Sequence, residues 1–183
     1  MNEFSLEGKN ALITGGGRGI GRAIALTFAE AGANVALTAR TMNQLEDVAD
    51  EIHSIGKRSL AFQADISNAD SVREMVAGVI NEFGVIDILV NNAGISTTPF
   101  SDPLSDAAWH QVIETNLSGP FYCCRAVAEG MKSRHSGSII NISSISGAMA
   151  TGGSVAYNSS KAGLNMMTKV LAMEWASYNI SVN

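Results

Sequence analysis

Thr14-Gly-Gly-Gly-Arg-Gly-Ile-Gly21 is the stretch that decides the fold, because it joins an apolar run at residues 10–14 to an amphipathic segment at residues 19–31. Its spaced glycines permit a tight turn, a close approach of the backbone to phosphate and close packing of the helix on the strand. Free amides at the start of the helix then face the anion. The spacing G-x-x-x-G-x-G differs from the commoner G-x-G-x-x-G, and a glycine-rich turn alone also occurs in ordinary loops. The stretch therefore predicts a dinucleotide site that needs independent support.

Strand-length apolar runs and amphipathic segments alternate along the rest of the chain. Such short apolar runs are typical of strands buried on both faces of a sheet. The alternation predicts a Rossmann-type, doubly wound parallel sheet in a three-layer α/β/α fold, with right-handed crossovers. The expected strands are residues 10–14, 34–39, 59–64, 86–90 and 138–142, with a sixth that opens at 180–183, and the expected helices are residues 19–31, 42–54, 69–83, 106–135 and 155–178.

Composition favours one domain over residues 1–183 and excludes several classes of function. The chain is 46% hydrophobic and 16% charged, which is enough apolar material for one substantial core. A net charge of -5 without a basic run argues against nucleic acid or an anionic membrane surface as the main partner. The polar start lacks a secretory pattern, which predicts a cytoplasmic location. The adjacent Cys123 and Cys124 read as reduced helix residues, and the three histidines have no metal-ligand spacing.

Two arginines bear on the choice of cofactor. An acidic residue about 20 positions after the glycines takes the adenosine ribose hydroxyls of NAD, whereas a basic residue there accommodates the 2′-phosphate of NADP. This chain has Ala39 and then Arg40 at that place, and Arg18 lies inside the glycine turn. Guanidinium groups suit a phosphate, so the sequence favours NADP(H). The alternative is that both arginines are ordinary surface charges.

Polar residues follow two further strands, at the sheet edge where ligands bind in open α/β folds. Asp65 and Ile66 come after the third expected strand, and Asn91-Asn-Ala-Gly94 comes after the fourth. Asp65 is expected to accept a hydrogen bond from an adenine amino group, and Ile66 to cover the ring. The structural alternatives are that Asp65 caps the next helix and that Asn91 and Gly94 only form a turn.

Tyr157-Asn-Ser-Ser-Lys161 is the candidate for the chemistry. Residues four apart share one face of a helix, so the phenol and the ammonium are expected to point the same way. A nearby ammonium favours ionisation of a phenol, which makes a tyrosine usable as a general acid or base. Ser144, after the fifth strand, is placed to polarise a carbonyl oxygen. A surface pair without function is the alternative for this spacing.

In this order and spacing, Thr14-Gly-x-x-x-Gly-Ile-Gly21, Asn91-Asn-Ala-Gly94, Asn116, Ser144 and Tyr157-x-x-x-Lys161 resemble the short-chain dehydrogenase/reductase family over essentially all 183 residues. The resemblance implies hydride transfer between a nicotinamide and a carbonyl or alcohol carbon. It implies that Tyr157 transfers the proton, that Lys161 favours the ionised phenol and holds the nicotinamide ribose, that Ser144 orients the substrate oxygen, and that Asn116 holds a water that relays protons. The expected cofactor-binding residues are Gly15, Gly17, Arg18, Gly19, Ile20, Gly21, Arg40, Asp65, Ile66, Asn92, Ala93, Gly94, Tyr157 and Lys161.

Two departures from the family pattern qualify this prediction. Many relatives have serine or another hydrogen-bonding residue at Gly17, so we expect a looser phosphate turn. Relatives also continue past Asn183 through a strand, a Pro-Gly turn, a lid over the substrate and a last strand, so we expect a fragment or a short form. An oxidoreductase and a nucleotide-binding or structural subunit without turnover are therefore both kept as hypotheses.

The sequence leaves several substrate classes open and predicts an oligomer. Residues 95–102 and 145–153 are expected to line the near wall of the pocket, and their small and apolar side chains fit a sugar, a polyol, a 3-oxoacyl thioester or another ketone. The resemblance implies a homodimer or homotetramer. The long helices carry apolar stripes expected mainly to cover the sheet. The stripe residues are Val112, Leu117, Phe121, Val127 and Met131 on the first helix and Leu164, Met167, Leu171 and Trp175 on the second.

Overall fold

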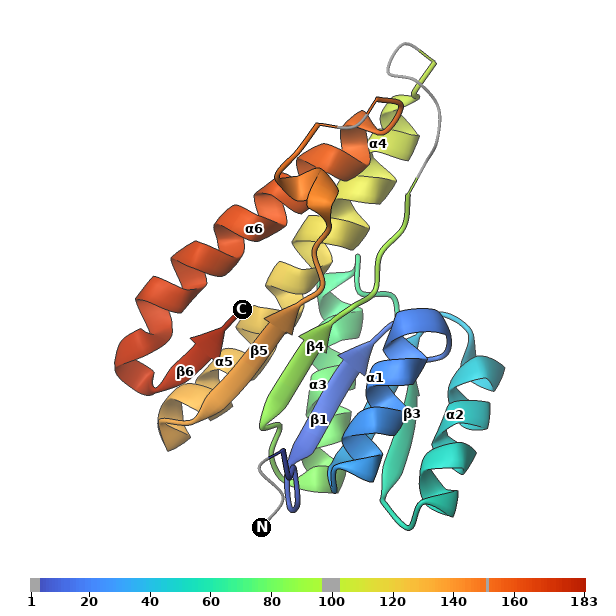
Figure 1. Ribbon diagram of the computed structural model, residues 1–183, viewed down its shortest axis with the longest axis vertical. Helices are drawn as coiled ribbons and strands as arrows, with labels where there is room; N and C mark the ends of the chain where they lie inside the picture. Colours follow the sequence, from blue (N-terminus) through green and yellow to red (C-terminus); the bar gives the residue numbers. More distant parts are fainter. Residues whose placement is uncertain (1–3, 97–102, 151) are drawn as a thin grey trace.

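A six-stranded parallel sheet forms the centre of the molecule in the computed structural model, which describes residues 4–96, 103–150 and 152–183. The strand order is β3-β2-β1-β4-β5-β6 (Figure 1). The order reverses direction between β1 and β4, the arrangement that opens a crevice for ligands in doubly wound sheets. The strands are β1 Asn10–Thr14, β2 Asn34–Ala39, β3 Ser59–Gln63, β4 Ile88–Asn91, β5 Gly137–Asn141 and β6 Ile180–Val182.

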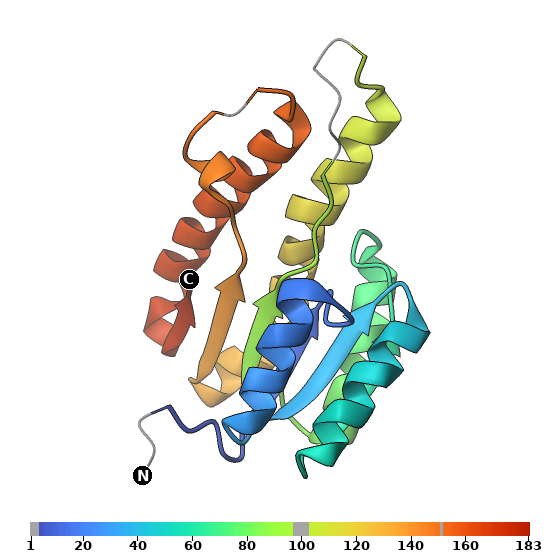
Figure 2. The ribbon, with the colours of Figure 1, turned by 45° about the vertical axis from the view of Figure 1, so that its right-hand side comes forward.

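Helices cover both faces of the sheet, which confirms the predicted three-layer fold. The helices α1 and α2 lie on one face, and α3, α5 and α6 lie on the other (Figures 1 and 2). Alternate residues of β1 supply the two cores: Leu12 faces α3 and α5, whereas Ala11 and Ile13 face α1 and α2. The helices are α1 Gly19–Glu30, α2 Met42–Ser54, α3 Ala69–Phe83, α4 Asp106–Ile113, α5 Gly119–Arg134 and α6 Val155–Trp175, and the short helical segments are η1 Glu114–Ser118, η2 Ile145–Gly147 and η3 Ala176–Tyr178.

The long helix predicted at residues 106–135 is interrupted by a π-helical turn, η1. Single π turns are rare and often accompany functional sites. Its only buried residue, Asn116, contacts the segment after β4, as described below. The apolar stripe of this helix is partly buried: Val112, Val127 and Met131 lie in the core, whereas Phe121 is 40% exposed and its ring lies tilted beside that of Tyr122. Phe121 thus belongs to the part of the stripe that does not cover the sheet.

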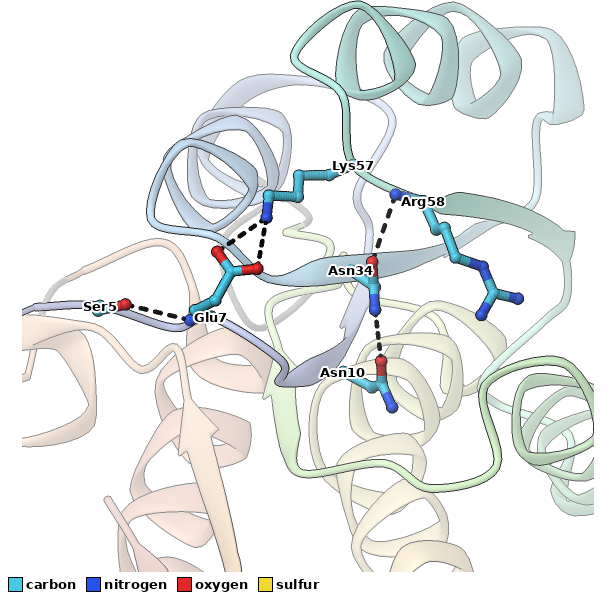
Figure 3. Close-up of polar contacts among 6 residues, drawn as sticks. All are labelled: Ser5, Glu7, Asn10, Asn34, Lys57 and Arg58. Carbon is cyan, nitrogen blue, oxygen red and sulfur yellow. Dashed lines mark hydrogen bonds and ion pairs between the residues drawn. The ribbon is translucent and has the colours of Figure 1, made fainter.

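Polar side chains align the starts of the first three strands at the edge opposite the glycine turn (Figure 3). Asn34 donates to the Asn10 side chain across 2.9 Å and accepts from the backbone of Arg58 across 3.3 Å. Lys57 reaches back to Glu7, with 2.9 Å between Nζ and each carboxylate oxygen. These contacts link the starts of β1, β2 and β3, at the end of β1 away from the glycine turn. Among the described residues, no helix is long and apolar enough to cross a membrane.

Candidate active site

The predicted site residues lie at the carboxyl ends of the strands. Figure 2 shows the arrowheads of β4 and β5 pointing toward the end of the molecule where α4 and the beginning of α6 extend past the sheet. The glycine turn follows β1, the segment Asn92–Gly94 follows β4, and Ser144 follows β5. The topology therefore brings to one edge groups that are far apart in the sequence.

The glycine turn is shaped by two different requirements. Gly15 and Gly19 have φ of +66° and +55°, a left-handed conformation that side chains rarely adopt. A β-carbon on Gly19 would meet no described atom within 4 Å, so this position is open toward the outside. A β-carbon on Gly21 would instead overlap the Gly15 carbonyl oxygen and lie 2.5 Å from Asn92 Nδ2. Gly21 is thus needed because a side chain would not fit there. Gly19 is needed for its left-handed backbone conformation, although there is open space beside it.

The segment that follows β4 is hydrogen-bonded to the start of the glycine turn. Asn92 Nδ2 donates to the carbonyls of Thr14, across 2.9 Å, and Gly15, across 3.1 Å. In return the buried Thr14 hydroxyl accepts from the amides of Asn92 and Ala93 across 3.0 and 3.1 Å. This role of Thr14 was not predicted, although a hydroxyl at the end of a buried strand is a recognisable signal. Asn92 and Ala93 therefore hold the turn in shape, whatever further contact they make with a ligand.

Asn91 and Gly94 do not merely form a turn. Asn91 is the last residue of β4, is buried, and donates to the Asn141 side chain across 2.8 Å. Gly94 lies where a β-carbon would be 3.3 Å from Asn116 Oδ1 and 3.7 Å from Lys161 Nζ. The turn-only alternative is therefore wrong, because one residue ties two strands together and the other lies beside the candidate catalytic groups.

Gly17 makes room for a neighbouring helix. A β-carbon there would lie 2.9 Å from the β-carbon of Gln44, near the start of α2. Because α2 packs this closely, a serine like that of many relatives would need the helix to shift. The absence of a side chain at Gly17 thus allows α2 to pack closely on the turn.

Arg18 and Arg40 are both exposed at the rim of the turn. Arg18 is the residue before α1, and Arg40 directly follows β2. The Gln63 side chain holds the Arg40 backbone by donating to its carbonyl across 2.8 Å. Within the described parts of the chain, neither arginine forms an ion pair. Both guanidinium groups are therefore free to meet an anion at this rim.

Asp65 and Ile66 occupy different environments at the end of β3. Asp65 is exposed, and its Oδ1 accepts from the amide and hydroxyl of Ser67 across 3.0 and 2.7 Å. It does not cap α3, because the side chain of Asn68 accepts from the first amides of that helix; the capping alternative for Asp65 is wrong. Ile66 is 5% exposed and packs closely on Gly119 of α5, so only a small part of it faces outward. The contacts of Asp65 and Ile66 with an adenine remain predictions.

Lys161 lies at the centre of the candidate catalytic groups. It is 4% exposed, and its Nζ donates to the carbonyl of Ile142 across 2.8 Å and lies 5.8 Å from the centroid of the Tyr157 ring. Burial lowers the pKa of Lys161 below that of an exposed lysine, because desolvation disfavours the charged form. The predicted helical spacing is thus realised on α6, with the ammonium close to the aromatic ring rather than out in solvent.

Asn116 connects this cluster to the segment after β4. Its Oδ1 accepts from the amide of Ile95 across 2.8 Å, and its Nδ2 donates to the carbonyl of Ile95 across 2.8 Å and to Ser160 across 3.1 Å. The side chain is therefore engaged with protein groups that position Gly94 and Ile95. The water-holding role implied by the family resemblance remains a prediction.

Ser144 is the residue before the short segment η2 and is half-buried. Its hydroxyl accepts from the amide of Ser146 across 3.1 Å. The segment lies directly on α6, because a β-carbon on Gly147 would be 2.8 Å from the carbonyl oxygen of Lys161. Of the predicted pocket-lining segments, residues 97–102 and residue 151 lie outside the described residues.

The two cysteines have no place in this chemistry. Both lie on the buried face of α5, and neither forms a disulfide bond among the described residues. Burial raises the pKa of the Cys124 thiol to about 12, and burial likewise raises the pKa of Cys123 far above the ordinary range. Buried, protonated thiols are poor nucleophiles, so the structure agrees with their interpretation as reduced helix residues.

Comparison with known proteins now identifies the family. Residues 9–183 match the family model described as short chain dehydrogenase, and the chain belongs to the short-chain dehydrogenase/reductase family of oxidoreductases. A similar curated protein is the 3-oxoacyl-(acyl-carrier-protein) reductase FabG of Staphylococcus epidermidis, 45% identical over 176 residues. That alignment covers 96% of this chain and 72% of the relative.

Two solved structures show how closely the fold is shared. A metagenomic short-chain oxidoreductase in complex with NADP superimposes with a TM-score of 0.93 at 36% identity, covering 96% of this chain and 80% of that one. An NAD⁺-bound xylitol dehydrogenase superimposes with a TM-score of 0.95 at 31% identity, covering 99% and 69%. The same fold therefore holds either dinucleotide in these relatives, and the choice for this chain depends on its own residues.

Proposed function

We propose that this chain is a single dinucleotide-binding domain that catalyses NADP(H)-dependent interconversion of a carbonyl compound and a secondary alcohol. The observation that carries the proposal is the continuity of the site. Asn92 donates to the backbone of the glycine turn. Two residues later, Gly94 lies beside Lys161, which is on the same helix, α6, as Tyr157. Groups suited to hold a cofactor and groups suited to move a proton thus occupy neighbouring positions at one sheet edge.

The residues present fit a dinucleotide. The open, left-handed Gly19 leaves space for a phosphate beside the first amides of α1, and the buried Lys161 presents a hydrogen-bonding ammonium farther along the same edge. Gly15, Gly19, Ile20 and Gly21 would hold the pyrophosphate, and Lys161 the nicotinamide ribose. When bound, the cofactor supplies or accepts the hydride.

The protein's own part in the reaction is proton transfer and orientation. In the reducing direction the Tyr157 hydroxyl donates its proton to the substrate oxygen, and the adjacent Lys161 ammonium stabilises the phenolate that is left. The Ser144 hydroxyl donates a hydrogen bond to the same oxygen, which fixes the carbonyl for attack. Asn116 positions the backbone beside Lys161. Each group performs the reverse step when an alcohol is oxidised.

Fluorescence titration with NADPH, followed by a substrate panel, tests the proposal. The panel contains a 3-oxoacyl thioester, a sugar, a polyol and a hydrophobic ketone, and the absorbance of NADPH reports turnover. We expect NADPH to bind and to be oxidised with at least one carbonyl compound. Binding without oxidation on any substrate would favour the other hypothesis, a nucleotide-binding or structural subunit without turnover. No binding would contradict the oxidoreductase and leave only a structural subunit.

Arg40 provides a separate test of cofactor preference. Arg40→Glu is expected to weaken NADPH binding roughly 10- to 100-fold, the effect of losing a charge-assisted hydrogen bond to phosphate. NADH binding should change by less than about threefold, because NADH has no 2′-phosphate for Arg40 to contact. Arg73→Glu on α3 makes the same charge change at an exposed arginine away from the turn and is the control. Equal losses for both cofactors would contradict this role of Arg40.

Exposed apolar side chains on the outer helices support the expectation of a homo-oligomer. Phe121 of α5 and Met166, Val170 and Met173 of α6 are between 40% and 82% exposed. Members of this family are often oligomers. Sedimentation velocity measures the assembly state, and a monomer at assay concentration would refute the expectation.

A further inference from the structure

Three consecutive residues, the last of β5 and the two that follow it, are each hydrogen-bonded to α6. Asn141 Nδ2 donates to Thr168 Oγ1 across 2.8 Å, and the carbonyl of Ile142 accepts from Lys161 Nζ across 2.8 Å. The next residue, Ser143, donates from its hydroxyl to Asn165 Oδ1 across 2.5 Å. The segment that leads to Ser144 is thus bound to the helix at every residue.

The three α6 partners form one polar row. Residues 161, 165 and 168 are spaced four and three apart, so they share one face of the helix. Asn165 is the member whose side chain also lies against Gly147, at the end of η2, because its Nδ2 would be 2.6 Å from a β-carbon there. Its amide therefore lies against both ends of residues 143–147. Ser144 is held inside this short loop.

Further hydrogen bonds tie the lower part of this row to α6 and to the sheet. Thr168 Oγ1 donates to the carbonyl of Leu164 across 2.8 Å, and Asn141 also accepts from Asn91 of β4 across 2.8 Å. The Ile142 amide donates to the carbonyl of Asn91 across 2.9 Å. The backbone is thus fixed up to Ile142 by the sheet and by Thr168. After Ile142, the next contact with α6 is made by the Asn165 side chain, which binds Ser143, the residue before Ser144.

We propose that Asn165 is a positioning residue that fixes the Ser144 hydroxyl relative to Tyr157 and Lys161, by binding Ser143 on the loop that carries Ser144. The proposal rests on the proposed function for its catalytic consequence. Its physical reason is that Ser144 and Tyr157 come from separate elements, and a misplacement of about 1 Å between reacting groups costs up to about 100-fold in rate. Asn165 contacts no reacting atom itself and acts through the loop.

A double-mutant cycle with Ser143→Ala and Asn165→Leu tests the proposal. Each single variant is expected to lower kcat about tenfold, with the NADPH dissociation constant within twofold of wild type. The double variant should lie within about twofold of the slower single variant, because both remove the same hydrogen bond. Ser143→Thr keeps the hydroxyl and should restore kcat to within about threefold of wild type. Lys169→Ala, at an exposed position four residues farther along α6 than Asn165, is the control and should leave kcat unchanged.

Amide hydrogen exchange supplies a readout that does not need turnover. In Asn165→Leu, the amides of residues 144–147 should exchange at least about tenfold faster than in wild type, with the rest of α6 unchanged. Faster exchange together with a coupled loss of kcat supports the proposal. Additive losses of kcat, an unchanged kcat with faster exchange, or unchanged exchange each overturn it. If wild type has no turnover on any substrate, the proposed function fails by itself, and exchange of residues 144–147 alone decides whether Asn165 holds the loop.

Discussion

Tyr157→Phe is expected to lower kcat by roughly 10²- to 10⁴-fold, the contribution of a positioned general acid or base. The substitution removes only the hydroxyl, so the ring that lies 5.8 Å from Lys161 Nζ remains in place. The NADPH dissociation constant should therefore stay within about threefold of wild type. NADPH oxidation with the best carbonyl substrate measures the rate, and fluorescence titration measures the binding.

Tyr178→Phe is the matched control for this substitution. Tyr178 ends η3, is 37% exposed, and lies beside the ring of His135 and the ammonium of Lys132, at the start of β6 and not at the carboxyl ends of the strands. Loss of its hydroxyl should leave kcat unchanged. A Tyr157→Phe protein that keeps more than about a tenth of the wild-type rate would remove the proton-transfer role, because a general acid at the reacting oxygen is worth more than that.

Gly21→Ala is expected to give the largest loss of stability, about 3 kcal/mol in the free energy of unfolding, together with loss of NADPH binding. The new β-carbon would overlap the Gly15 carbonyl oxygen and lie 2.5 Å from Asn92 Nδ2. The carbonyl is backbone and Asn92 is held by its own hydrogen bonds, so neither moves without distorting the turn, and overpacking of this kind typically costs 1–3 kcal/mol. Urea denaturation and NADPH titration measure the two effects.

Gly130→Ala separates this steric effect from the general effect of replacing a glycine. Gly130 lies inside α5, and among described atoms a β-carbon there would meet only Arg134 Nη1, at 3.3 Å, which donates to the Gly130 carbonyl across 2.9 Å and would have to shift by a few tenths of an ångström. Because alanine is favoured over glycine within a helix by about 0.5–1 kcal/mol and this shift offsets part of that gain, the free energy of unfolding should change by less than about 1 kcal/mol. Equal denaturation midpoints for Gly21→Ala and wild type would show that the turn tolerates a side chain, contrary to its geometry.

Local patterns in the sequence predicted most of the backbone. The strands at residues 10–14 and 34–39 and the helices Met42–Ser54 and Ala69–Phe83 have the predicted bounds. Strand length, helical period and the glycine-rich turn are properties of neighbouring residues, so they can be read without knowing the fold. Alternation of the two kinds of element then determined the parallel sheet and its two helical layers.

Contacts between distant residues were beyond such patterns. The π turn at Asn116, the packing of α2 against Gly17 and the capping of α3 by Asn68 were not predicted. Each depends on which of several polar or small residues meets a partner. Exposed Phe121 shows the same limit, since a helical stripe defines a face without saying where the sheet ends.

The sequence by itself thus determined the order of elements, the position of the glycine turn and the pairing of Tyr157 with Lys161 on one helix face, because each follows from a repeat of a few residues. Only the tertiary structure decided that Lys161 is buried beside Gly94 and that Asn165 binds the loop of Ser144. These contacts arise where separate elements cross. The crossing is determined by how whole layers pack, and no local period encodes it.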